Sequence, residues 1–317
     1  MTENAALKTR TYTVTVAAKL VAFTVALVAL FGGGALLGGL IDPGAPGDQD
    51  AAAQGHGGPA GAHAPAHGTT STAEDHAGAG KAAVQAVRGL AVAENGLRLV
   101  IDTPEIRRGQ TTTLRFRILD EDGRTVRDFD VEHTKRLHLI VVRRDMTGFW
   151  HLHPAQDQDG AWTTPIRVGT PGSYRVLADF SHGGRLTTLA ADLRADGDAD
   201  LQPLPAPASS ATSDRGYRVR VSSGPVTAGD EAQLRYVVRK DGRPVTTEPF
   251  LGARGHLVAL REGDLAFLHV HPVSSGAADA VVRFASTFPS AGRYRLYLQF
   301  QHEGRVHTVA FTQEVSR

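Results

Sequence analysis

The sequence predicts an all-β protein, with two tandem immunoglobulin-like β-sandwich domains preceded by one transmembrane helix and a disordered stalk. Three observations predict this architecture: an uncharged apolar run near the N-terminus, two low-complexity segments, and an internal repeat of about 105 residues. The chain has 317 residues and 41% hydrophobic content, which is enough to build a core in each of two domains.

The apolar run at 20–41 is long enough to cross the roughly 30 Å hydrocarbon layer as a helix. Basic residues precede it and acidic residues follow it, at Lys8, Arg10 and Lys19 and at Asp42, Asp48 and Asp50. The positive-inside rule therefore predicts a cytoplasmic N-terminus at 1–19 and a single-pass anchor that holds the bulk of the chain outside the cell membrane. A cleaved signal peptide is the alternative, but the small residues at 51–53 lie well beyond the apolar run.

Two segments have the composition of linkers. Residues 42–84 are mostly Ala, Gly and Pro, a composition that cannot offset the entropy of ordering the chain, and they form the predicted stalk. Four histidines lie in it and either collect metal ions loosely or act as polar filler: His56, His63, His67 and His76. The second segment, 195–213, is rich in Pro, Ala and Ser and separates domain 1 at 85–194 from domain 2 at 214–317.

The two domains are copies of one another. Asp122-Gly123-Arg124 aligns with Asp241-Gly242-Arg243, and the Gly, Tyr and Arg of 172–175 align with those of 292–295. Each copy reads as short strands with turn signals between them, such as "TTTLRFRIL", "RLHLIVVRR", "FWHLHP" and "SYRVLADF". Such a pattern in about 105 residues predicts an antiparallel sandwich of immunoglobulin type without its disulfide.

Eight of the ten histidines in these domains pair in register between the copies. The pairs are His138 with His256, His151 with His269, His153 with His271, and His182 with His302. His133 and His307 have no counterpart, and we expect them at the surface or beside a site rather than in it.

The geometry of strands predicts that the members of each set meet. Residues two apart share a face, so His151 and His153 project together, and a turn at 145–148 would bring His138 opposite them. His182 ends a strand expected to pair with the one that begins at His138. We therefore expect four histidines to converge at one end of each sandwich.

Imidazole nitrogens suit divalent ions such as Zn(II), Ni(II) and Cu(II), and the usual affinity order favours Cu(II). The predicted ligands are His138, His151, His153 and His182 in the first copy, and His256, His269, His271 and His302 in the second. The predicted ion is Cu(II), with Zn(II) as the alternative. The same histidines could instead be packing residues whose nitrogens bond backbone carbonyls, because a duplicated fold would retain those too.

Composition excludes several other classes of function. The formal charge is only +1 and the charges are interleaved, so no nucleic-acid partner is indicated. Without cysteine there are no disulfides, thiolate sites, iron–sulfur clusters or cysteine nucleophiles, and two methionines offer little thioether chemistry. No nucleophile elbow or phosphate-binding loop supports a hydrolase or a nucleotide-binding protein.

The segments "RLHLIVVRRDMTGFWHLHP", "PGSYRVLADFSHGGR" and "PSAGRYRLYLQFQHEGR" resemble the repeated unit of membrane-anchored extracytoplasmic proteins of high-GC bacteria. That family is linked to heavy-metal handling, chiefly of copper, and its domains are similar in type to CopC and YtkA-like sandwiches. The resemblance implies the fold and the compartment. It departs from CopC itself, whose copper site uses a free N-terminal amine, because the N-terminus here is expected in the cytoplasm.

Three functions follow from these observations. The leading one is a non-enzymatic metal-binding protein that holds the ion outside the membrane for buffering, delivery or sensing. The main alternative is a structural or interaction module of tandem domains with merely buried histidines. The third is a metalloenzyme resembling a tandem cupin, since "GDLAFLHVH" fits G-x5-H-x-H, although no suitably spaced Glu and no closing motif follow.

Overall fold

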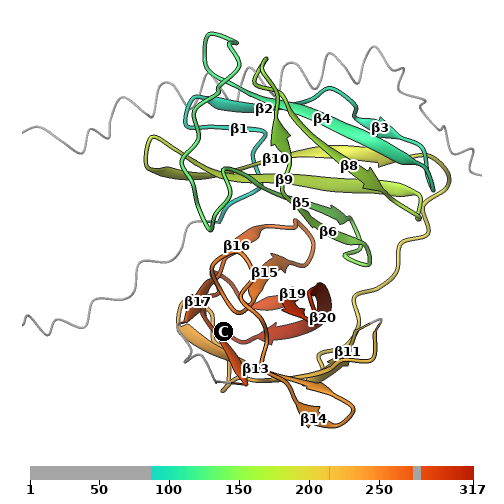
Figure 1. Cartoon of the computed structure of the whole chain (residues 1–317), viewed down its shortest axis with the longest axis vertical. Helices are drawn as coiled ribbons and strands as arrows, with labels where there is room; N and C mark the ends of the chain where they lie inside the picture. Colours follow the sequence, from blue (N-terminus) through green and yellow to red (C-terminus); the bar gives the residue numbers. More distant parts are fainter. Residues whose placement is uncertain (1–86, 214, 274–279) are drawn as a thin grey trace, which may run out of the picture. The chain divides into compact units, whose positions relative to one another are not determined.

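Twenty β-strands, and no α-helix, make up the part of the chain that the computed structural model describes, which is residues 87–213, 215–273 and 280–317 (Figure 1). All of these described residues belong to one compact unit. The predicted transmembrane helix and stalk lie outside the described residues. Within the described ranges no helix is long and apolar enough to span a membrane.

The first sandwich consists of two five-stranded sheets. One sheet has the order β1 (Ala93–Glu94), β2 (Leu97–Ile101), β4 (Thr111–Leu119), β8 (Trp162–Arg167) and β7 (Ala155–Gln156). The other has the order β3 (Glu105–Ile106), β10 (Arg185–Ala195), β9 (Gly172–His182), β5 (His138–Arg143) and β6 (Phe149–Leu152). All pairings are antiparallel except that of β3 with β10.

The second sandwich repeats this plan. One sheet has the order β11 (Ser210–Thr212), β12 (Arg218–Ser222), β13 (Glu231–Lys240), β18 (Val281–Thr287) and β17 (His271–Val273), and β14 (Arg243–Pro244) pairs with β13. The other has the order β16 (Phe267–His269), β15 (His256–Arg261), β19 (Gly292–His302) and β20 (Arg305–Val315). The all-β fold and the tandem duplication predicted from the sequence are therefore confirmed.

The strand order is that of an immunoglobulin domain. In the first sandwich β2-β4-β8-β7 follow the order A-B-E-D and β10-β9-β5-β6 the order G-F-C-C′, and the second sandwich matches it strand for strand. Each copy also has a tyrosine corner at the start of its F strand. The Tyr174 hydroxyl donates to the Thr170 carbonyl at 2.6 Å, and the Tyr294 hydroxyl donates to the Ser290 carbonyl at 2.9 Å.

The core of the first sandwich fixes which side chains of β5 and β9 point inward. Leu139 and Val141 of β5 lie in that core together with even-numbered residues of β9, such as Val176 and Phe180. Successive side chains of a strand point to opposite faces of the sheet, so His138, next to the inward-facing Leu139, lies on the outer face. Here "outer" means turned away from the sandwich's own core.

A third apolar cluster, which we call the joint, covers this outer face. It combines side chains of the first sandwich, among them Ile140, Val142 and Leu177, with Val258 and Leu260 of the second. The side chains of β5 are therefore buried on both faces of the sheet. An exposed outer face would have left β5 half-solvated, as in most antiparallel sheets.

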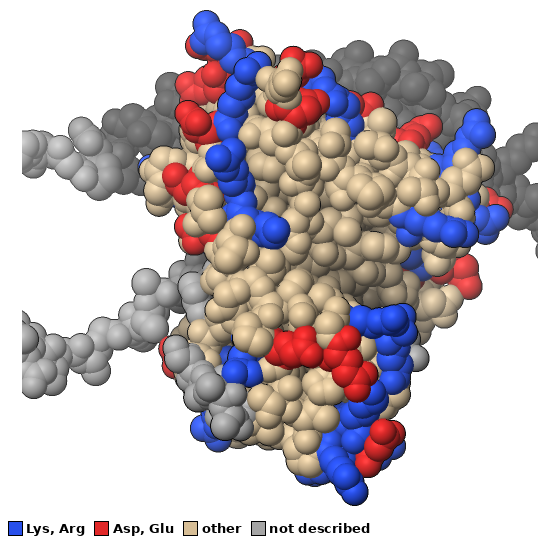
Figure 2. All heavy atoms as spheres, viewed as in Figure 1, with Lys and Arg blue, Asp and Glu red and all other residues tan. Residues whose placement is uncertain are grey.

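Tyr297 of the second sandwich makes two further contacts across the joint. The ring of Phe149 stacks on that of Tyr297 with the centroids 3.9 Å apart. The Tyr297 hydroxyl donates to the Met146 carbonyl at 2.6 Å. Elsewhere, basic and acidic side chains lie interspersed over the face shown in Figure 2, in agreement with the near-zero net charge.

Candidate metal centre

The β5–β6 hairpin brings three histidines together. Leu139 pairs with Leu152 and Ile140 with His151, so the next position of the ladder sets His138 opposite His153. The chain reverses between the strands through Met146, whose φ of 60° gives the tight turn, and the Met146 amide donates to the Arg143 carbonyl at 2.7 Å. The hairpin and the shared face of these three histidines were predicted from the sequence.

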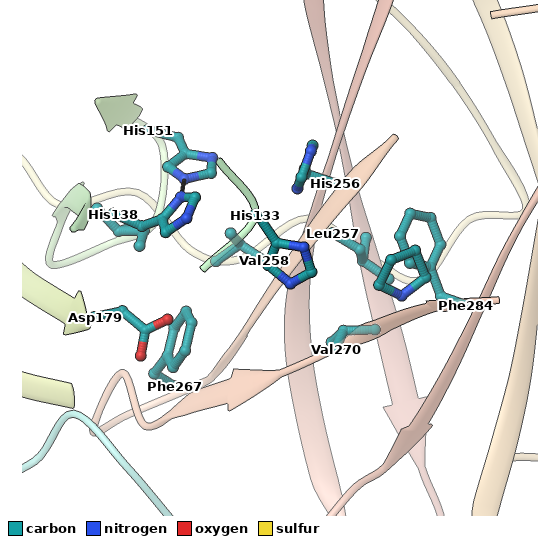
Figure 3. A pocket seen from close by; sticks show the side chains of 12 residues that line it. His133, His138, His151, Asp179, His256, Leu257, Val258, Phe267, Val270 and Phe284 are labelled. Carbon is teal, nitrogen blue, oxygen red and sulfur yellow. Dashed lines mark hydrogen bonds between the residues drawn. The ribbon is translucent and has the colours of Figure 1, made fainter. Parts of the chain in front are cut away.

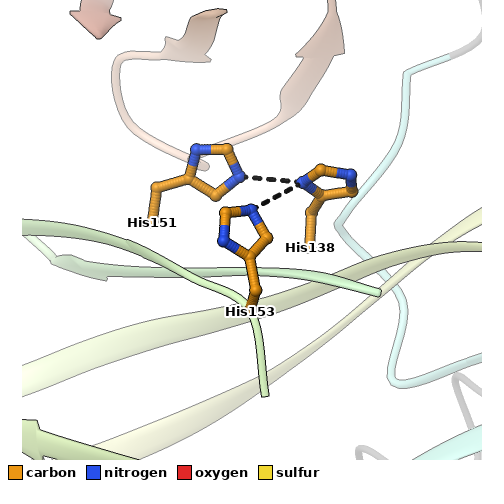
Figure 4. Close-up of side chains that lie close together, drawn as sticks. All are labelled: His138, His151 and His153. Atoms are coloured by element: carbon orange, nitrogen blue, oxygen red, sulfur yellow. Dashed lines mark hydrogen bonds between the residues drawn. The ribbon is translucent and has the colours of Figure 1, made fainter. Parts of the chain in front are cut away.

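The ring nitrogens of the three converge on one point (Figure 4). His138 Nδ1 lies 3.1 Å from His151 Nε2 and 3.2 Å from His153 Nε2, and all three atoms lie within 4.8 Å of one another. With metal–nitrogen bonds of about 2.0–2.1 Å, nitrogens on a tetrahedral ion lie roughly 3.3 Å apart and their ring centres roughly 5 Å apart. The three ring centres here are 5.3, 5.0 and 4.9 Å apart. The triad therefore has the spacing of three ligands to one ion.

Hydrogen bonds on the far side of two of these rings determine their tautomers. His138 Nε2 lies 3.1 Å from the Glu132 carbonyl, which can only accept, so Nε2 carries the proton. His151 Nδ1 lies 2.7 Å from Gln299 Oε1 and donates to it, while Gln299 Nε2 donates to a threonine hydroxyl at 3.2 Å. The nitrogens that face each other, His138 Nδ1 and His151 Nε2, therefore both present lone pairs.

Two lone pairs at 3.1 Å repel each other, and a cation between them, either a proton or a metal ion, removes that repulsion. The surroundings disfavour the proton. Burial lowers the pKa of His151 well below its ordinary value of 6.5, and the rings of His138 and His153 lower it further. Burial, together with His138, lowers the pKa of His153 to about 4. His151 and His153 are therefore neutral near pH 7, the state in which imidazoles bind metal ions.

His182 does not join the triad, which corrects the predicted set of four. His138 pairs with Asp179, and directly opposite residues share a face, so the odd-numbered residues of β9 lie on the outer face. His182 is even-numbered and lies on the inner face, where Nδ1 contacts the Asp128 carbonyl at 2.7 Å. The expectation failed because it considered only that the end of one strand lies beside the start of the other. It did not establish whether the even- or the odd-numbered residues of β9 share a face with His138.

The second copy divides its histidines for the same reason. His256 pairs with Gln299 on the outer face, whereas His302 lies on the inner face with Nδ1 2.9 Å from the Tyr217 hydroxyl. The side chains of His269 and His271 lie outside the described residues. Their backbones belong to β16 and β17, which lie in different sheets. The expected convergence of His256 and His302 at one site is therefore wrong.

Two further histidines have positions that the sequence did not indicate. His133 lies in the tight turn Glu132–Lys135 with a φ of 47°, and its ring lies 6.3 Å from that of His138 and 5.9 Å from that of His256. These rings and that of His151 line one pocket (Figure 3). His307, expected at the surface or beside a site, is only 4% exposed and packs against aromatic rings of the second sandwich.

A family model described as a domain of unknown function (DUF8832) matches the chain twice, at residues 91–197 and 211–317. No curated protein matches the sequence. Similar solved structures include the Escherichia coli adhesin FdeC, with 14% identity, a TM-score of 0.25, and coverage of 72% of this chain and 66% of the adhesin chain.

Another is the Yersinia pseudotuberculosis adhesin InvE, with 12% identity, a TM-score of 0.23, and coverage of 70% and 60% of the two chains. A chimeric titin Z1Z2 shows 14% identity, a TM-score of 0.20, and coverage of 69% and 97%. This chain therefore spans about two thirds or less of the adhesin chains. At such TM-scores these likenesses carry no conclusion about function.

Proposed function

Because the chain belongs to the DUF8832 family, whose description assigns no function, we propose from the geometry of its own residues that it is a metal-binding protein. It holds one divalent ion on His138, His151 and His153. The observation that carries this proposal is the pair of facing lone pairs on His138 Nδ1 and His151 Nε2, each fixed by a carbonyl oxygen behind its ring.

Carbonyl oxygens behind metal-binding histidines are a general feature of such sites, because they orient the ring and raise the basicity of the opposite nitrogen. The Glu132 carbonyl and the Gln299 side chain have these positions here. A pair of packing histidines would be more stable with one N–H directed at the other ring. The arrangement therefore favours a cation site over a satisfied core cluster.

The ligand chemistry selects the ion. Three imidazoles with neither thiolate nor thioether suit Cu(II) and Zn(II), and the usual affinity order puts Cu(II) first. Three protein ligands also match the number that Zn(II) takes in sites with one further position. We therefore propose Cu(II), with Zn(II) as the second choice, and a role in buffering, delivering or sensing the ion rather than in catalysis.

The place of action is part of the proposal. The apolar run at 20–41 and its flanking charges support a single-pass anchor, with both sandwiches outside the membrane. The sequence resemblance to copper-linked membrane-anchored proteins with CopC and YtkA-like sandwiches supports the same compartment. A copper ion in that compartment meets no cytosolic thiol pool, so an all-imidazole site could retain it.

The test is a titration of the purified full-length chain with Cu(II) and with Zn(II) against a competing chelator. All proteins carry alanine in place of the four stalk histidines, so that these residues contribute no binding of their own. One variant replaces His138 and His151 by alanine, and the matched control replaces His182 and His302, which also removes two histidines but from the inner faces. We expect the parent and the control to bind with equal affinity and the triad variant to lose at least 100-fold. Equal binding by all three, or by none, would refute the proposal.

The second candidate is a structural or interaction module, and the joint favours it. Its apolar side chains, together with the stacked Phe149 and Tyr297, join the two sandwiches without any ion. In that case the triad variant would lose stability and the parent would bind no ion. The same titration, accompanied by thermal unfolding, therefore separates the two functions.

A further inference from the structure

The triad supplies three nitrogens, whereas a structural zinc site or a tetragonal copper site takes four donors. We infer that His256, from the second sandwich, is the fourth ligand of the ion that the triad holds. This inference rests on the proposed function. The sequence assigns His256 and the triad to two separate sites, one in each copy, whereas the inference places them in one shared site.

A backbone carbonyl oxygen lies behind the ring of His256, as one does behind the ring of His138. His256 Nε2 lies 2.8 Å from the Phe250 carbonyl, six residues upstream, and His138 Nε2 lies 3.1 Å from the Glu132 carbonyl, also six residues upstream. Both carbonyls can only accept, so each ring carries its proton on Nε2 and presents a lone pair at Nδ1. The duplicated fold has kept the acceptor behind the ring, and not only the histidine.

The position of His256 relative to the triad allows it to reach the same ion. Its ring centre lies 6.3 Å from that of His151, about 1 Å more than the roughly 5 Å expected between rings on one tetrahedral ion. Both rings line the pocket in Figure 3, whose cavity of about 50 Å³ leaves room for such a shift.

Two other histidines are weaker choices. His302 lies on the inner face of its sheet and contacts the Tyr217 hydroxyl. His133 lines the same pocket, and its ring centre also lies 6.3 Å from a triad ring, that of His138, but it is held in a tight turn with positive φ. It serves as the competing ligand in the test.

An ion bound by both sandwiches would add a coordinate link to the contacts that already join them. One such contact, the hydrogen bond from His151 Nδ1 to Gln299 Oε1, connects a triad ligand directly to the second sandwich. Loading the site would then stabilise both sandwiches against unfolding together. A site built from the triad alone would protect mainly the first.

The test compares His256→Ala, His133→Ala and the matched control His302→Ala in the full-length chain with alanine at the stalk histidines. Zn(II) affinity is measured by chelator competition, the number of bound ions by elemental analysis, and the ligand field by the visible spectrum of bound Co(II). Thermal unfolding of the metal-free proteins verifies that each variant folds. We expect His256→Ala to lose more than about 10-fold in affinity, because the loss of even a hydrogen-bond partner behind a ligand costs roughly 10- to 100-fold, and to change the Co(II) spectrum, as water replaces a nitrogen.

The control and His133→Ala should retain the parent affinity and spectrum. An unchanged His256→Ala, with the triad still essential, would overturn the inference and leave the proposed function standing. The inference would equally be overturned if His256→Ala lost one of two bound ions, since His256 would then serve a separate site. A parent that binds no ion would refute the proposed function itself.

Discussion

The lowered pKa of His153 makes a quantitative prediction for the metal-free protein. Burial takes that pKa from 6.5 to about 4, so protonation of the ring favours the unfolded chain. The stability that depends on a neutral His153 is therefore complete above about pH 6.5 and is lost as the pH falls towards 4. A single group with these two pKa values loses about 2 kcal/mol between pH 7.5 and pH 5. Because the side chain is partly exposed, we expect about 1–2 kcal/mol.

The perturbation is His153→Gln, which keeps a polar side chain of similar length but cannot titrate. The assay is urea unfolding in the presence of EDTA, at pH 7.5 and pH 5, followed by tryptophan fluorescence. Both tryptophans, Trp150 and Trp162, lie in the first sandwich and report on its unfolding. We expect the free energy of unfolding of the parent to fall by about 1–2 kcal/mol more than that of the variant over this interval.

The matched control is His182→Gln, on the opposite face of the same sheet. This control separates the loss of a triad histidine from the loss of any histidine. Between pH 7.5 and pH 5, the free energy of unfolding of His182→Gln should fall by about as much as that of the parent. Parallel losses in the parent and in His153→Gln would refute the reasoning, because His153 would then have the same pKa in the folded and unfolded chains. A larger loss in the variant would mean that protonated His153 stabilises the fold.

Three further predictions follow from single contacts. Gln299→Leu removes the acceptor behind His151 and should weaken Zn(II) binding about 10- to 100-fold in chelator competition while the chain still folds. Asp145→Asn leaves the buried Arg143 without its ion-pair partner and should lower the free energy of unfolding by about 3 kcal/mol in urea; a loss below 1 kcal/mol would contradict this. Tyr174→Phe removes the tyrosine-corner hydrogen bond and should cost about 0.5–1.5 kcal/mol in the same assay, whereas an unchanged midpoint would show that the bond adds nothing.

The strands and the repeat could be predicted because their signals are local. Alternation along "TTTLRFRIL" and "SYRVLADF" gives the strand period directly, and the hairpin at 145–148 lies between two apolar runs that must pair. The shared face of His151 and His153 also follows from a period of two. These features depend on neighbouring residues, and so the sequence alone predicts them.

The outcome for His182 depended on long-range register. Whether an even or an odd residue of β9 lies opposite His138 is set by packing across the sandwich, and a shift of one residue exchanges the two faces. The sequence of β5 offered no help, because the strand is buried on both sides and reads as a continuous apolar run. The joint that buries its second face comes from the other sandwich.

The sequence by itself therefore determined the all-β class, the duplication and the hairpin that carries His138, His151 and His153. Only the tertiary structure decided that His182 and His302 lie on inner faces, and that Gln299 and His256 come from the second sandwich to the outer face of the first. The physical reason is that strand period is a property of consecutive residues. The face that a strand buries against another domain depends on residues more than a hundred positions away.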